Sequence, residues 1–153
     1  HKKFLASRIA DLCLLSAVAL VGIGTGSLEL DVALARIAAL PELPTGLEVA
    51  AVLFAASAAL KCAQLPFHGW LIQVMEAPTP VSALLHAGIV NIGGFLMIRL
   101  APLVGAAEAA QLMLVVAGTL TAVVAALVMT TRVSIKVALA WSTCAQMGFM
   151  LLQ

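Results

Sequence analysis

The chain has 153 residues, of which 63% are apolar and only 10% are charged. Its mean hydropathy of +1.16 is too high for a water-soluble surface, because a soluble domain is about half apolar and about a quarter charged. The net charge of +1 and the lack of a basic tract exclude a nucleic-acid-binding domain. The three cysteines stand alone in the sequence, which favours small apolar packing residues over a metal motif or a disulfide framework.

Five apolar stretches have the length of a membrane span, which needs about 20 mostly apolar residues. Ala, Leu and Gly dominate these stretches, and none of them alternates strictly between apolar and polar residues, so helices are expected rather than strands. The sequence therefore predicts an all-α fold, a polytopic transmembrane helix bundle. The expected spans are about 4–24, 46–65, 79–100, 109–131 and 134–153.

The first residue is His1 rather than Met, and no cleavage site with a polar mature region follows the first apolar stretch. We therefore expect residues 1–153 to be an internal fragment of a single, larger membrane domain.

The charges between the spans predict the orientation of the bundle. With five spans, the N-terminus and the links 66–78 and 132–136 share one side, and the loops 25–45 and 101–108 share the other. The first side has five basic residues and the second has two, which places the first side in the cytoplasm. The loop 25–45 is then expected outside the cell.

Lys61 is a charged residue at the end of an otherwise uncharged stretch. It lies 13 residues after Glu48, roughly 20 Å along a helix, which is past the middle of a hydrocarbon core about 30 Å thick. An ammonium at that depth needs a carboxylate partner or a water-filled cavity. The alternative is that Lys61 extends its side chain to the membrane surface and anchors the helix.

The residues after Lys61 predict an interruption of the helix. Pro66 removes a backbone donor, and Gly69 adds conformational freedom next to His68. Broken helices at membrane depth present free backbone groups to ions in transporters. The alternative is a helix that simply ends at the membrane surface, where His68 would also be at home.

His86 lies seven residues into the third expected span, about 10 Å below its start at Thr79. An imidazole titrates near neutral pH and can pass a proton in either direction. A single buried histidine is more often a hydrogen-bonded packing residue, but Lys61 at similar depth on the preceding span favours a relay. Asn91 lies deeper on the same span and is a second candidate for the path.

Lys136 opens the fifth expected span, and Thr143 and Gln146 follow further in. Lys136 and Thr143 are seven residues apart, so they share one helix face. Such polar residues could carry a chain of water molecules, or they could hold helices together. Lys136 could equally be a cytoplasmic anchor.

Two ordered motifs resemble a known family. Residues 61–71 (Lys-Cys-Ala-Gln-Leu-Pro-Phe-His-Gly-Trp-Leu) and 78–87 (Pro-Thr-Pro-Val-Ser-Ala-Leu-Leu-His-Ala) are similar to the core of the antiporter-like membrane subunits of respiratory complex I and of Mrp-type sodium/proton antiporters. Residues 135–136 and 141–150 continue the likeness. The resemblance implies an antiporter-like fold with one interrupted helix and a proton path through Lys61, His86 and Lys136. It also implies that the glutamate paired with the central lysine lies upstream of this chain.

Within this family, residues 86–91 and 140–146 resemble the membrane subunits of DAB inorganic-carbon-accumulation complexes. That likeness implies a proton- or cation-conducting subunit in a bacterial inner membrane, without a cofactor of its own. It also implies a large zinc-containing, carbonic-anhydrase-like partner subunit that carries any catalysis. The alternatives are a proton-pumping subunit of an NADH-quinone oxidoreductase and an Mrp-type antiporter subunit.

Overall fold

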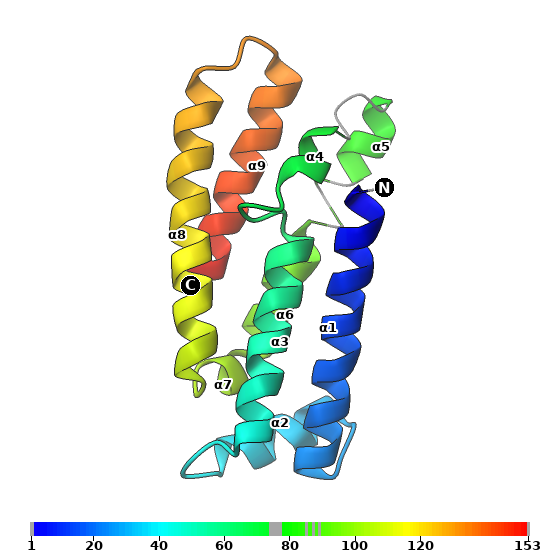
Figure 1. Ribbon diagram of the computed structural model, residues 1–153, viewed down its shortest axis with the longest axis vertical. Coiled ribbons are helices and arrows are strands. Elements are labelled where there is room, and N and C mark those ends of the chain that lie inside the picture. Colours follow the sequence, from blue (N-terminus) through cyan, green and yellow to red (C-terminus); the bar gives the residue numbers. More distant parts are fainter. Residues whose placement is uncertain (1, 74–77, 85, 87, 89, 153) are drawn as a thin grey trace.

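The computed structural model describes residues 2–73, 78–84, 86, 88 and 90–152, and these form helices and turns without any strand. The all-α prediction is therefore confirmed for this part of the chain. The helices, shown in Figure 1, are α1 (Lys2–Thr25), α2 (Leu30–Ala38), α3 (Thr45–Lys61), α4 (Gly69–Gln73), α5 (Thr79–Leu84), α6 (Asn91–Arg99), α7 (Ala101–Val104), α8 (Glu108–Thr130) and α9 (Ile135–Leu152).

Within the described part of the chain, three helical stretches are long and apolar enough to cross a membrane, namely Phe4–Thr25, Glu108–Thr130 and Ile135–Leu152. They match the predicted spans 4–24, 109–131 and 134–153 closely, because long stretches rich in Ala, Leu and Val leave few other choices in lipid.

The other two predicted spans differ from the structure. The span predicted at 46–65 is the 17-residue helix α3, which stops at Lys61 because the chain turns there. The span predicted at 79–100 consists of α5 and α6 as separate helices, and residues 85, 87 and 89 between them lie outside the described part. A total of five spans therefore stays a prediction.

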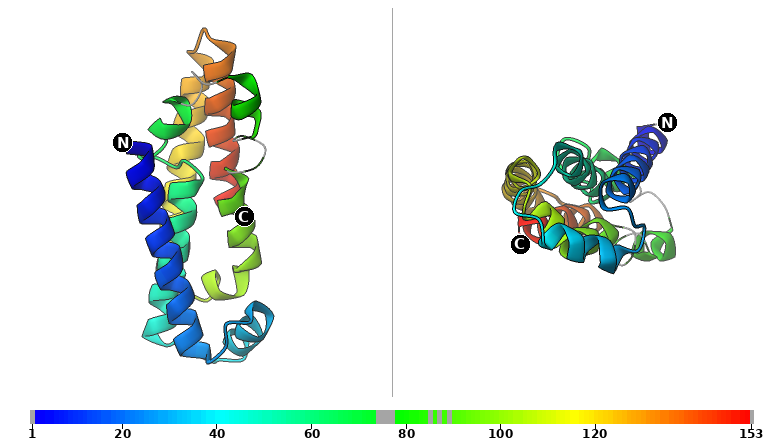
Figure 2. Two further views of the ribbon diagram at one scale, coloured as in Figure 1. Left: turned by 90° about the vertical axis from the view of Figure 1, so that its right-hand side faces the viewer. Right: turned by 90° about the horizontal axis from the view of Figure 1, so that it is seen from below.

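The helices α1, α3, α8 and α9 run along one long axis (Figure 1). The N-terminus, α4, α5 and the α8–α9 connection lie towards one end, and α2 and α7 lie at the other (Figures 1 and 2). This arrangement agrees with the predicted division of the connections into two sides. The cytoplasmic location of the first side stays a prediction.

The segment 25–45, the predicted loop between the first two spans, contains the short helix α2. This helix lies across the end of the bundle (Figure 2) and buries two apolar side chains four residues apart. It is tied at both ends by charged side chains. Arg36 donates a hydrogen bond to the carbonyl of Thr25 at the end of α1, and Arg99 at the end of α6 lies 2.5 Å from Asp31.

The long hairpin of α8 and α9 is packed with direct backbone contact. A Cβ atom added at Gly118 would lie 2.8 Å from the carbonyl oxygen of Gly148, and one added at Gly148 would lie 2.7 Å from the carbonyl oxygen of Gly118. Small residues at facing positions let membrane helices approach this closely and gain van der Waals contact. The hairpin supports α3, which packs against both α1 and α8.

Candidate functional site

The chain breaks its helical course directly after Lys61, as the sequence predicts. The N–H of Cys62 still bonds the carbonyl of Ala58 at 2.8 Å, but Ala63 has a φ of 52°, in the left-handed region that side chains other than glycine rarely adopt. A cis peptide bond precedes Pro66, and helix resumes as α4 at Gly69. The interruption is therefore confirmed, and it begins within one residue of the lysine.

The backbone groups freed by this break are satisfied by specific partners. The N–H of Gln64 bonds the carbonyl of Ala59 at 3.0 Å. The N–H of Leu65 donates to the hydroxyl oxygen of Thr121 on α8, also at 3.0 Å. Thr121 is fully buried, and its own hydroxyl donates to the carbonyl of Ala117 at 2.7 Å. A side chain from another helix thus replaces the missing intrahelical bond.

Lys61 has a carboxylate partner within the chain. Its Nζ lies 2.7 Å from Oδ1 of Asp11, and the two side chains are 27% and 35% exposed. One nitrogen of Arg8 lies 3.7 Å from the other carboxylate oxygen, so a single carboxylate faces two cations. Ser57 supports the contact, because its hydroxyl donates to the carbonyl of Ala10 at 2.9 Å and joins α3 to α1 beside the ion pair.

The ammonium also lines a small cavity. Its volume is about 120 Å³, which leaves room for several water molecules. Lys61 thus has both features that can stabilise an ammonium within a membrane domain, a carboxylate partner and a space large enough for water. The cavity is lined by Ala6, Ser7, Ala10, Leu60, Lys61, Trp70 and Ile92.

His86 lies between α5 and α6, and its side chain is half-buried. Both ring nitrogens are buried, and neither has a hydrogen-bond partner among the interactions of the described residues. Asn91 opens α6 and is half-buried. No described contact joins His86 to Lys61, so the relay role of His86 stays a prediction.

His68 faces α9 across the break. Its ring centroid lies 4.9 Å from that of Trp141, with the planes tilted by 44°. The guanidinium of Arg132 lies 5.9 Å from the centroid of the same indole ring. Trp141 is buried, so His68 is a contact between the break and α9 rather than a free interfacial side chain.

The polar residues predicted to share one face of α9 do not lie around Lys61. Lys136 is exposed in the first turn, and Gln146 is exposed further along. The hydroxyl of Thr143 donates to the carbonyl of Leu139 within its own helix, at 3.0 Å. Among the described residues the structure brings Lys61 to Asp11, but it shows no contact from Lys61 to Lys136. The path role of Lys136 stays a prediction.

Two residues of the site were not among the sequence-based candidates. Asp11 could have been found, because it is the only acidic residue before Glu29 and lies near the start of α1. In an antiparallel helix pair this places it level with Lys61, near the end of α3. Thr121 carried no usable signal, because a threonine inside a helix normally bonds its own backbone.

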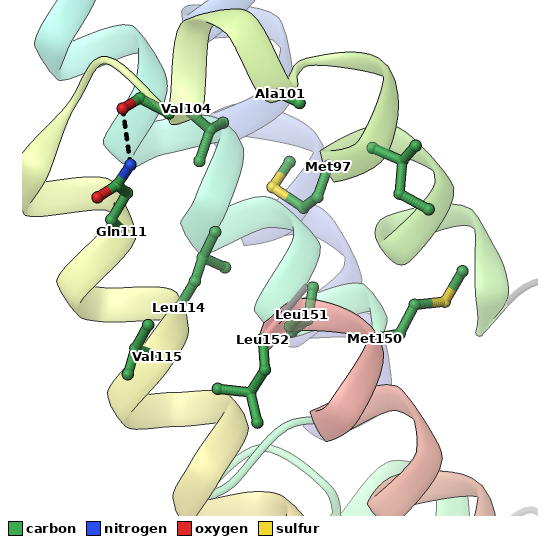
Figure 3. Close-up of a pocket in the computed structure, with 11 residues that line it drawn as sticks. Met97, Ala101, Val104, Gln111, Leu114, Val115, Met150, Leu151 and Leu152 are labelled. Carbon is green, nitrogen blue, oxygen red and sulfur yellow. Dashed lines mark hydrogen bonds between the residues drawn. The ribbon is translucent and has the colours of Figure 1, made fainter.

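A larger pocket of about 440 Å³ lies beyond the end of α9 (Figure 3). Its lining is mostly Leu, Val, Ile and Met. The side-chain amide of Gln111 donates a hydrogen bond to the carbonyl of Gly105 at 2.6 Å. No charged side chain lines it, so it has little to offer an ion. The described residues also contain no group of three His, Cys, Asp or Glu side chains that could hold a metal ion.

Membrane-length helices, a broken helix and an ion pair at the break together define a multi-pass membrane domain with a charged site among its helices. The chain belongs to the family described as NADH:quinone oxidoreductase/Mrp antiporter, TM, whose model matches residues 1–153.

Individual relatives refine this placement. The chain is 52% identical to a probable inorganic carbon transporter subunit DabB of Hydrogenovibrio crunogenus, over the whole chain and 30% of that protein. It is 51% identical to the probable subunit DabB2 of Halothiobacillus neapolitanus, over the whole chain and 28% of that protein. The solved Mrp complex from Dietzia sp. DQ12-45-1b has a chain with a TM-score of 0.89 and 37% identity, covering 99% of this chain and 17% of that one. The chain thus spans less than a third of the length of these relatives.

Proposed function

We propose that this chain is part of the ion-conducting membrane subunit of an inorganic-carbon (CO2/bicarbonate) uptake complex in a bacterial inner membrane. The observation that carries ion conduction is the Lys61–Asp11 pair, 2.7 Å long, at the end of a broken helix. Two relatives named as probable inorganic carbon transporter subunits, at 52% and 51% identity, support carbon uptake over the more distant Mrp-type role at 37%.

The geometry supports a proton step at Lys61. The carboxylate of Asp11 holds the ammonium of Lys61 at 2.7 Å, and movement of that carboxylate would leave Lys61 facing the adjoining cavity. Arg8 offers Asp11 a second cation to bind. When Asp11 turns towards Arg8, Lys61 releases its proton into the adjoining cavity, and when Asp11 returns, Lys61 takes up another. His86 and Lys136 would continue the path.

The hydration of CO2 itself requires chemistry that an ion path does not supply. We place this chemistry in a large zinc-containing partner subunit that resembles a carbonic anhydrase. Ion flow through the membrane subunit would then drive the partner's reaction in the direction of bicarbonate. The alternative roles, in an NADH-quinone oxidoreductase or an Mrp antiporter, would use the same lysine with different partners.

The test is growth rescue of a carbonic-anhydrase-deficient bacterium in air. The full-length protein, co-expressed with its zinc-containing partner, should restore growth, and a pair that carries Lys61→Ala at equal membrane levels should not. If the wild-type pair is well expressed and fails, while the protein supports pumping with redox subunits or sodium/proton exchange with Mrp subunits, the carbon-uptake assignment is wrong.

A further inference from the structure

We propose that Thr121 is a positioning residue of the ion path, and that its hydroxyl fixes the broken end of α3 so that Lys61 stays beside Asp11. The effect on transport rests on the proposed function. The contact between Thr121 and the break is a separate property of the fold and can be measured without any transport.

The N–H of Leu65 has no acceptor within a helix, and Thr121 supplies one. Leu65 is followed by Pro66, which has no N–H, so the amide of Leu65 is the last donor before the chain turns. The carbonyl it would meet in a continuous α-helix is that of Lys61, but helical geometry ends there. The N–H therefore needs an acceptor from elsewhere, and the hydroxyl oxygen of Thr121 lies 3.0 Å away.

The hydroxyl of Thr121 acts as donor and acceptor at once. It donates to the carbonyl of Ala117 in its own helix, as threonines in membrane helices commonly do. Its oxygen also accepts the hydrogen bond from the N–H of Leu65. Thr143 on α9 makes the same kind of bond within its own helix, to the carbonyl of Leu139. Because Thr121 is 0% exposed, a water molecule has little access to replace it. Valine would fill the same volume and leave the N–H without this acceptor.

Cys62, which follows Lys61, contacts the start of α6. The Sγ of Cys62 lies 3.3 Å from the carbonyl of Val90, and a Cβ added at Gly93 would lie only 2.6 Å from that sulfur. The short segment from Lys61 to Leu65 is thus fixed by α6 near one end and by Thr121 at the other. Release of the second contact would let the last turn of α3 shift and would lengthen the Lys61–Asp11 distance.

The experiment compares Thr121→Val with Thr121→Ser in the full-length protein with its partner. Thr119 on the same helix is exposed, so Thr119→Val is a matched control that removes a hydroxyl away from the break. Hydrogen exchange by mass spectrometry reports on the segment 62–68 directly. We expect Thr121→Val to accelerate exchange there by roughly tenfold, the usual scale for one lost buried hydrogen bond, whereas Thr121→Ser and Thr119→Val should leave it unchanged.

The second measurement is bicarbonate uptake as a function of pH, at membrane levels matched by blot. Thr121→Val should lower uptake by roughly tenfold and change its pH profile, because the contact between Lys61 and Asp11 would be lengthened. Thr121→Ser should restore both rate and pH profile. A variant that was merely less stable would lose protein and keep its pH profile.

The outcomes separate this inference from the proposed function. Faster exchange in Thr121→Val with wild-type protein that transports no inorganic carbon would support the contact and refute the carbon-uptake role. Unchanged exchange in Thr121→Val would overturn the positioning role. Faster exchange with normal uptake and a normal pH profile would overturn it as well, because the contact would then not act on Lys61.

Discussion

Lys61 and Asp11 are 50 residues apart in the sequence, yet the ammonium nitrogen lies 2.7 Å from the carboxylate oxygen. The contact follows from the antiparallel packing of α1 and α3, which brings the start of one helix level with the end of the other. Charged groups within membrane helices are costly unless they are paired or hydrated.

The proposed function requires Lys61 to exchange its proton during transport. We expect Lys61→Ala to reduce uptake by the full-length complex to background without loss of assembly. Lys61→Arg should also impair uptake strongly, because a guanidinium keeps its proton throughout the useful pH range. Ion-dependent uptake, normalised to membrane levels, is the measurement. Near-normal uptake by both variants would show that Lys61 is only an anchor.

The carboxylate of Asp11 should matter more than the guanidinium that shares it. Asp11→Asn removes the partner of Lys61 and should lower uptake by about tenfold or more, since it leaves an ammonium without a counter-charge. Arg8→Gln should have a smaller effect, because Arg8 is 3.7 Å from Asp11 and its side chain is 62% exposed. Equal losses in the two variants, measured in the same uptake assay, would contradict this order.

His86 should contribute less than Lys61. We expect His86→Ala to retain a measurable part of the uptake, because a water molecule can take the position of the imidazole and carry a proton between neighbouring groups. The comparison is made with Lys61→Ala in one strain and at equal expression. A complete loss of uptake in a correctly assembled His86→Ala variant would contradict this prediction and show that the histidine is essential for the path.

A single methyl group added at the contact between α8 and α9 should lower the stability of the protein. Gly148→Ala places a Cβ 2.7 Å from a backbone oxygen and 2.9 Å from a backbone nitrogen, so the helices must separate. We expect a loss of about 1–3 kcal/mol in stability, measured as a lower Tm of the purified protein. Gly46→Ala is the matched control, because a Cβ there meets nothing within 4 Å. A similar Tm for both variants would refute the close-packing argument.

The long helices and the break were predictable because each has a strong local signal. Long, mostly apolar stretches define α1, α8 and α9, and a charge followed by Pro66 defines the end of α3. The nine-residue helix α2 was missed, because its position depends on contacts with the ends of other helices.

The candidate site was predictable only in part, for the same reason. Lys61 could be singled out by its depth, but its partner depends on which helices are neighbours, and no periodic pattern gives that. Thr121 could not be found at all, because its role lies in accepting a hydrogen bond from a distant backbone group.

The backbone contact between Gly118 and Gly148 has a mechanical consequence. The two helices cannot approach further, and separating them would lose the van der Waals contact that the small residues allow. We therefore expect the hairpin, about 35 Å long by the rise of α8, to move as one unit. Lys136 lies at the exposed end of the hairpin and Thr121 lies within α8, so a displacement of that end would reach the break beside Lys61 through the Thr121 contact.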